Sequence, residues 1–156
     1  MSLHVGQFRA NVVRPTLQGL NQWSEAAELL LLGTAVQESG LRFLAQLGGG
    51  PALGLYQMEP ATHSDIHSNF LAYRQGLSGL VAALLVPSMP RIEQLVWNLR
   101  YATAMARIHY LRDRAPLPAP NDIDGLGALW KRHYNTPAGA GTAEQFVLNL
   151  RRALVG

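Results

Sequence analysis

The chain has 156 residues, of which 48% are hydrophobic, and this suits one globular domain over residues 1–156 with a buried core. It contains no cysteine, which excludes disulfides and thiolate zinc sites. The net charge is +3, and Lys131 is the only lysine among the 13 lysines and arginines. A basic surface rich in arginine could bind nucleic acid, an anionic membrane or an acidic cell-wall polymer. An ordinary solvated surface, however, explains the small excess of positive charge more simply.

The first 22 residues carry no secretory signal pattern, because Arg9, Arg14 and Pro15 interrupt any apolar stretch. The longest apolar run, residues 29–36, is far shorter than a membrane span. We therefore expect no membrane insertion, and any action outside the cytoplasm requires a delivery route other than a signal peptide.

The first strong element is an apolar helix over residues 24–38. Ser24 is a favourable N-cap, and Gly40 suits a left-handed stop. Because the helix is apolar on nearly every side beyond its first turn, we expect it to be central and buried.

A glycine-rich segment with a proline follows at residues 47–58, and it predicts a loop or a short hairpin. Pro60 then suits the first turn of a helix that continues to residue 73. Residues 76–86 are apolar and predict a further buried helix that ends before Pro87.

Residues 90–112 predict one long helix with an apolar face. The proline-rich residues 115–120 predict a stiff connector, and helices at 122–134 and 142–154 complete the chain. No strand periodicity is present, so the predicted fold is mainly α. The apolar face of the long helix would consist of Leu95, Leu99, Ala102, Ala106 and Tyr110.

Glu38 stands out because it is a carboxyl group at the end of the apolar helix. Burial raises the pKa of such a group, which allows it to donate a proton to a leaving oxygen near neutral pH. Taken alone, however, a helix-terminal glutamate that points into solvent is the simpler interpretation.

Three segments together resemble the soluble lytic transglycosylases, a lysozyme-like family. That family combines Glu-Ser at a helix end, the pattern Gly-Leu-Met-Gln-Ile-x-Pro-x-Thr, and Tyr-Asn before a glycine-rich turn. The resemblance spans about residues 24–142, and the extended middle segment is similar to versions found in tailed-phage proteins. The matching segments are Glu38-Ser39, Gly54-Leu55-Tyr56-Gln57-Met58-Glu59-Pro60-Ala61-Thr62 and Tyr134-Asn135.

The resemblance implies a lysozyme-like fold with a buried central helix and a glycine-rich loop or small hairpin that lines the cleft. It implies cleavage of the β-1,4 bond between N-acetylmuramic acid and N-acetylglucosamine of peptidoglycan, without a cofactor or metal. The partners would be glycan strands of the bacterial cell wall in the periplasm and, for a virion-associated protein, other virion proteins.

The resemblance also implies roles for single residues. Glu38 would be the sole acid and base, giving anhydro-muropeptides. The loop Gly54, Leu55, Tyr56 and Gln57 would line the cleft, with Tyr56, in place of the usual methionine, as a stacking platform for a sugar. Tyr134 would hydrogen-bond Glu38, with Asn135 beside it, and Ser39 would support the Glu38 loop rather than contact sugar. Because YNTPAG replaces the common Tyr-Asn-Ala-Gly, the placement of Asn135 stays open.

Two other patterns suggest binding functions. His63 and His67 have the spacing of metal ligands on one helix face, but HSDIH lacks the glutamate of zinc proteases and no third ligand is near, which favours surface histidines. Arg100 and Arg107 could form a basic stripe, yet no nucleic-acid recognition motif accompanies them.

Two alternatives retain the fold but change the function. A lysozyme-type hydrolase needs a second carboxylate, for which Glu59 and Asp65 are the nearest candidates. An inactive glycan-binding or virion structural module needs no acid, and the presence of Glu38, Gln57 and Tyr134 together argues against it.

Overall fold

The structure is a computed structural model, and it describes all residues, 1–156. The fold is mainly helical, as the sequence predicts, and it contains no strand. Two isolated antiparallel bridges, Ala45 with Leu53 and Leu53 with Met58, fold the glycine-rich segment into a compact double turn. None of the helices combines the length and apolar character needed to cross a bilayer.

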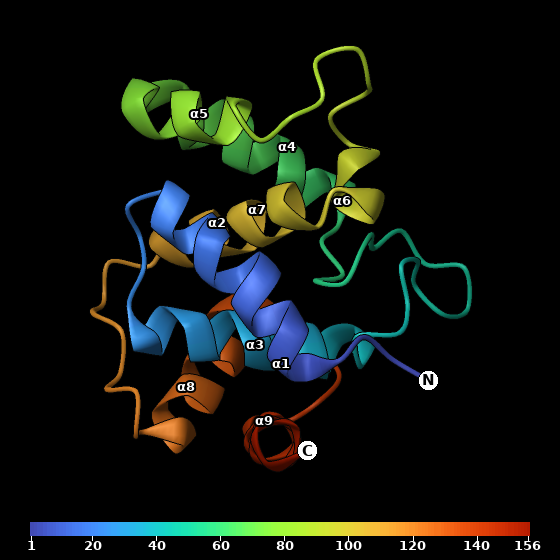
Figure 1. Cartoon of the computed structure of the whole chain (residues 1–156), viewed down its shortest axis with the longest axis vertical. Coiled ribbons are helices and arrows are strands. Elements are labelled where there is room, and N and C mark those ends of the chain that lie inside the picture. Colours follow the sequence, from blue (N-terminus) through green and yellow to red (C-terminus); the bar gives the residue numbers. More distant parts are fainter.

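The helices pack in two groups, one around α3 and the other around α7 (Figure 1). In chain order they are α1 Val5–Phe8, the π-helix η1 Arg9–Val13, α2 Arg14–Gly19, α3 Glu25–Ser39, α4 Pro60–Asn69, the 3₁₀-helix η2 Leu71–Tyr73, α5 Gln75–Ala82, α6 Gln94–Trp97, α7 Leu99–Leu111, α8 Ile123–Leu129, the π-helix η3 Trp130–Asn135 and α9 Ala143–Val155.

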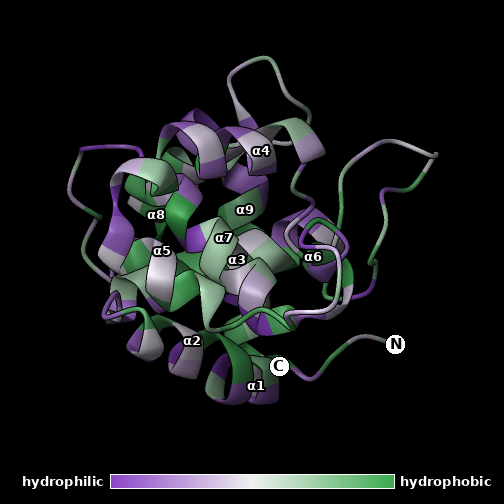
Figure 2. Cartoon of the chain, turned by 90° about the horizontal axis from the view of Figure 1, so that it is seen from above, coloured by the Kyte–Doolittle hydropathy of each residue, from purple (hydrophilic) through white to green (hydrophobic).

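Helix α3 begins and ends close to the predicted positions. Ser24 Oγ accepts a hydrogen bond from the backbone N–H of Ala27, and Gly40 ends the helix with a φ of 60°. The helix is buried along most of its length and packs against α9, α7, α8 and the N-terminal helices. Figure 2 shows α3 and α7 near the middle of the molecule, with the other helices around them. A helix without a polar face requires this coverage on all sides.

The prediction of one long helix over residues 90–112 is wrong. Asn98 separates α6 from α7, with an extended backbone at φ −92° and ψ 90°. Its side-chain oxygen accepts from the N–H of Tyr101, and its amide nitrogen donates to the carbonyl of Leu84 at 2.8 Å. Asparagine is a favoured N-cap, so the side chain starts a new helix where the apolar pattern alone suggests continuity.

The prediction of a buried helix over residues 76–86 is also wrong. Helix α5 ends at Ala82, and Val81 is its only buried residue. The turn after it is held by Gln94, whose side chain bonds both the N–H and the carbonyl of Val86. Helix α5 therefore lies at the periphery, and the predicted helix to residue 73 stops at Asn69 before the 3₁₀ turn η2.

Gly54, in the glycine-rich loop, lies close against the backbone of α6. Its φ is +75°, and a Cβ at this position would lie 1.9 Å from the carbonyl oxygen of Leu95. We expect Gly54→Ala to lower the free energy of unfolding by about 3 kcal/mol or more, because strain and a backbone clash act together. Urea denaturation measures this loss.

Gly48→Ala is the matched control, because Gly48 has a similar φ of +82° but a Cβ there would meet no atom within 4 Å. We expect this variant to lose only about 1 kcal/mol, the cost of a left-handed alanine. Equal losses in the two variants would contradict the proposed clash with Leu95.

Candidate active site

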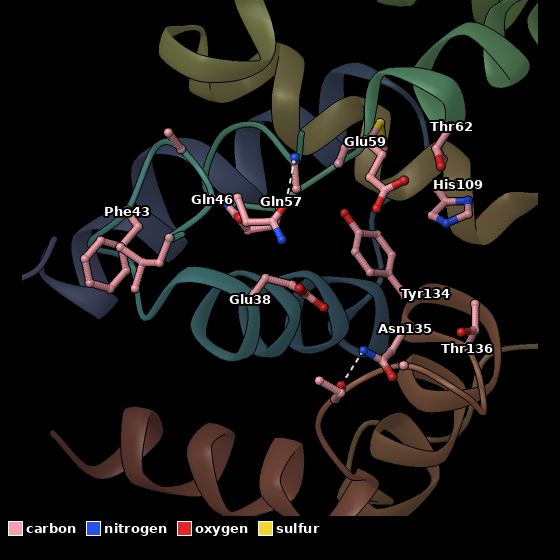
Figure 3. A pocket seen from close by; sticks show the side chains of 16 residues that line it. Glu38, Phe43, Gln46, Gln57, Glu59, Thr62, His109, Tyr134, Asn135 and Thr136 are labelled. Atoms are coloured by element: carbon pink, nitrogen blue, oxygen red, sulfur yellow. Dashed lines mark hydrogen bonds between the residues drawn. The ribbon is translucent and has the colours of Figure 1, made fainter. Parts of the chain in front are cut away.

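A cleft of about 640 Å³ opens at the C-terminal end of α3 (Figure 3). Its walls come from α3, the loop of residues 43–58, the start of α4, α7, and η3 with the turn that follows it. The lining residues are Glu38, Phe43, Ala45, Gln46, Leu47, Ala52, Gln57, Met58, Glu59, Thr62, His109, Tyr134, Asn135, Thr136, Gly139 and Ala140.

Glu38 lies on the wall of this cleft, on the last turn of α3. Burial raises the pKa of its carboxyl group to about 7, and a hydrogen bond from the indole of Trp130 opposes this rise. Trp130 Nε1 donates to Glu38 Oε1 at 2.9 Å, and no lysine, arginine or histidine forms an ion pair with this carboxyl group. Glu38 can therefore hold a proton near neutral pH, as a general acid must.

Glu28, ten residues earlier on the same helix, has the opposite environment. Its side chain is 1% exposed and forms ion pairs with Arg9 and Arg14. The indole of Trp23 also donates to it, at 2.7 Å. Burial raises the pKa of Glu28, but the hydrogen bonds from Arg14, Trp23 and Arg9 outweigh burial and lower the pKa to about 2. Glu28 is thus a structural residue that is ionised at neutral pH, whereas Glu38 has no cation to compensate its charge.

Tyr134 lines the cleft, but it does not form the hydrogen bond to Glu38 that the resemblance implies. Its hydroxyl donates to the backbone carbonyl of Tyr56 at 2.6 Å, and its ring stacks on Tyr110 with a centroid separation of 5.3 Å. Tyr134 therefore joins η3 to the glycine-rich loop.

Trp130 makes the contact that was expected of Tyr134, although none of the sequence patterns above points to it. The two residues lie four positions apart, at the start and near the end of η3, and only Trp130 bonds the end of α3. A tryptophan four residues before the tyrosine of the Tyr-Asn motif is the signal that could have indicated it.

Three of the four predicted loop residues are buried beneath the cleft and do not line it. Leu55 and Tyr56 are 2% and 1% exposed. The Tyr56 hydroxyl lies 3.0 Å from Thr103 Oγ1, so the ring occupies the core and cannot stack on a sugar. Gly54 is buried as well, and its missing side chain makes room for the carbonyl of Leu95 rather than for a ligand.

Gln57 is the one predicted loop residue that lines the cleft. Its backbone has a positive φ of 47°, which is unusual for a residue other than glycine and often occurs at functional sites. Its Nε2 donates to the carbonyl of Gly54 at 2.8 Å, while its side-chain oxygen makes no hydrogen bond within the protein. That oxygen is free to accept one from a ligand.

Asn135 lines the cleft and holds the turn that follows it. Its Oδ1 accepts from Lys131 Nζ at 2.8 Å, and its Nδ2 donates to the carbonyl of Ala140 at 2.7 Å. Lys131 also donates to the carbonyls of Gly139 and Gly141. The single lysine thus fixes one wall of the cleft.

Ser39 follows Glu38 directly but does not reach the cleft. It is buried, with 3% of its surface exposed, and its Oγ donates to the carbonyl of Ala35 at 3.0 Å. This contact lies within the last turns of α3, the helix that carries Glu38.

The two candidate second carboxylates lie in different places. Glu59 lines the cleft and stands across it from Glu38 (Figure 3). Asp65 lies outside the cleft on α4, where it pairs with Arg112 and accepts a hydrogen bond from Asn69.

The expectation of surface histidines is wrong for His63, which is buried, whereas His67 is partly exposed. Their Nε2 atoms lie 2.7 and 2.9 Å from the hydroxyl of Tyr101, and His63 is buried. Burial lowers the pKa of both imidazoles to about 4, so both are neutral near pH 7. No group of three or more histidines, aspartates and glutamates is arranged to hold a metal ion.

Comparison of the chain with protein-family models, with curated proteins and with solved structures finds no match. The site offers one protonatable acid without a counter-ion, a free amide oxygen on Gln57 and a second carboxylate on the opposite wall, and such a set can support general acid and base chemistry.

Proposed function

We propose that the protein is a lytic transglycosylase with a lysozyme-like fold, which cleaves the bond between N-acetylmuramic acid and N-acetylglucosamine in peptidoglycan. The observation that carries this proposal is Glu38, whose carboxyl group has a raised pKa on the wall of an open cleft. The resemblance of the Glu38, Gln57 and Tyr134 segments to that family supports the choice of substrate. Its partners are then glycan strands of the cell wall, with delivery by a phage particle as the route that the resemblance suggests.

In the proposed reaction Glu38 acts twice. The protonated carboxyl group gives its proton to the glycosidic oxygen as the bond to the muramyl carbon breaks. The resulting carboxylate then accepts the proton of the muramyl residue's own primary hydroxyl, whose oxygen attacks that carbon and closes an anhydro ring. No water is consumed, and Glu38 returns to its protonated form.

The chemistry of the cleft walls fits a saccharide. Phe43 and Leu47 offer apolar surface to the faces of sugar rings, while Gln57 and Glu59 offer hydrogen-bond acceptors to hydroxyl and acetamido groups. An intramolecular nucleophile that is already positioned has a large entropic advantage, with effective molarities of roughly 10⁵ M or more. One acid can therefore suffice without a second carboxylate.

The products released from purified sacculi test this proposal. We expect muropeptides that end in anhydro-muramyl residues, about 18 mass units lighter than hydrolytic ends because water is not added. Mass spectrometry of the digest measures the ratio of the two ends. Predominantly reducing muramic ends would contradict the single-acid mechanism.

A lysozyme-type hydrolase is the second candidate, because Glu59 also lines the cleft. In a hydrolase this carboxylate would activate water or act as nucleophile. Glu59→Gln separates the two functions: it should abolish hydrolysis, but it should leave the anhydro product within a few-fold of wild type. Asp65 is not available for this role while it pairs with Arg112 outside the cleft. Binding of glycan without any cleavage would instead favour the inactive structural module.

A further inference from the structure

Trp130 is the only residue that donates a hydrogen bond to the Glu38 carboxyl group. The bond is 2.9 Å long and joins residues 92 positions apart in the sequence. An indole carries one N–H and no acceptor, so the direction of this bond is certain.

The packing around Trp130 fixes the indole in place. Trp130 is 1% exposed and stacks on Phe146 of α9, with ring centroids 5.6 Å apart. Phe146 in turn lies over Gly33 of α3, where a Cβ would come within 2.4 Å of its Cζ atom. Gly33 and Glu38 belong to the same helix, so the contacts form a closed circuit from α3 through Phe146 and Trp130 back to α3. The indole therefore cannot turn away from the carboxyl group without disturbing the core.

We propose that Trp130 is a positioning residue for Glu38. Its indole N–H holds Oε1 of Glu38, so that the transferable proton resides on Oε2 of the same carboxyl group. The hydroxyl oxygen of a carboxylic acid is a weaker acceptor than its carbonyl oxygen, and the indole N–H therefore favours the tautomer with the proton on the other oxygen. The catalytic meaning of this arrangement rests on the proposed function, whereas the hydrogen bond and its electrostatic effect do not.

The same bond shifts the range of pH over which Glu38 is protonated, against the larger effect of burial. Burial alone raises the pKa of the carboxyl group, and a donor to the ionised form limits that rise. Trp130 thus keeps the pKa near neutrality, where the group can both give and accept a proton.

The first test compares Trp130→Phe with Tyr134→Phe. Each removes one polar hydrogen from η3, but only Trp130 bonds Glu38 while the Tyr134 hydroxyl bonds the backbone of Tyr56. We expect Trp130→Phe to raise the pKa of Glu38 by about one unit or more, and Tyr134→Phe to leave it unchanged. Carbon-13 NMR of glutamate-labelled protein measures both values, with Glu38→Gln to assign the signal. A shift in Tyr134→Phe but not in Trp130→Phe would overturn the proposal.

A second measurement uses the unmodified protein and does not depend on the folding of a variant. The indole N–H signal of Trp130 should move with pH, with a midpoint near 7, because its acceptor gains charge there. It should stay still in Glu38→Gln. Trp23 is an internal control, because its indole bonds Glu28, whose pKa of about 2 lies outside the range from pH 5 to 9. An immobile Trp130 signal would overturn the proposal.

Activity provides a third readout that separates positioning from general structure. If the proposed function holds, Trp130→Phe should lower kcat about tenfold with little change in KM and move the alkaline limb of the pH profile upward. If Glu38→Gln retained glycan cleavage, the proposed function would fail, but the NMR titrations would still decide whether Trp130 positions the carboxyl group.

Discussion

Glu38→Gln should reduce the cleavage of purified peptidoglycan by about a thousandfold or more, within the range attributed to general acid–base catalysis. Glutamine keeps the size of the side chain and an oxygen that can accept from Trp130, but it has no proton to give to a leaving oxygen. Loss of turbidity in a suspension of sacculi measures the rate. Activity within a few-fold of wild type would remove Glu38 from the mechanism.

The same variant should be more stable than wild type at alkaline pH. Folding raises the pKa of Glu38 from its ordinary value near 4.5 to about 7, so the folded state binds more protons than the unfolded state between these values. Stability is therefore lost as the pH rises through this window, and the cost is complete above pH 7. We expect a gain of up to about 3 kcal/mol in Glu38→Gln at pH 8 and none at pH 4. Urea unfolding at both pH values tests this, and equal stabilities at pH 8 would contradict burial of the charge.

The ends of several helices could be predicted because their signals are local. Ser24 caps α3, Gly40 ends it, and Thr142 begins α9 with a capping box to Gln145. These contacts lie within a few residues of one another, so the sequence pattern contains both partners. The central position of α3 was predictable for the same reason, since its apolar character is visible in its own residues.

The contacts of the candidate site were harder to predict, because they join distant segments through irregular helices. Trp130 and Tyr134 lie on η3, where the backbone N–H of Thr136 donates to the carbonyl of Lys131, five residues earlier. Arg9 lies on η1, where the N–H of Arg14 bonds the carbonyl of Arg9 with the same spacing. A π-turn changes the direction in which side chains project, and regular helical periodicity does not anticipate it.

The loop residues show a further limit of motif reasoning. A motif match places Tyr56 in the cleft by position, but its ring is large and apolar enough to fill the core, where Thr103 satisfies its hydroxyl. Of the four loop residues that the resemblance implies, Gly54 to Gln57, only Gln57 lines the cleft.

Glu28→Gln should lower the free energy of unfolding by about 3 kcal/mol at pH 7, since removal of one member of a buried ion pair typically costs 3–5 kcal/mol and the two arginines here are partly exposed. Glu25→Gln is the matched control, because Glu25 is exposed in the same first turn, and a change within about 0.5 kcal/mol is expected there. A Glu28 variant as stable as the Glu25 variant would contradict the structural role.

The pH dependence of the Glu28→Gln destabilisation distinguishes loss of the ion pairs from a simple packing defect. Because folding lowers the pKa of Glu28 to about 2, its stabilising contribution is complete above its ordinary pKa near 4.5 and is lost as the pH falls toward 2. The difference between wild type and Glu28→Gln should therefore shrink between pH 5 and pH 2, whereas a packing defect would persist. The same substitution in one helix should thus destabilise the protein at position 28 and stabilise it at position 38 above pH 7. The neighbours of each carboxyl group account for this opposition: three donors, two of them cationic, hold Glu28 ionised, and a single neutral indole leaves Glu38 free to exchange its proton.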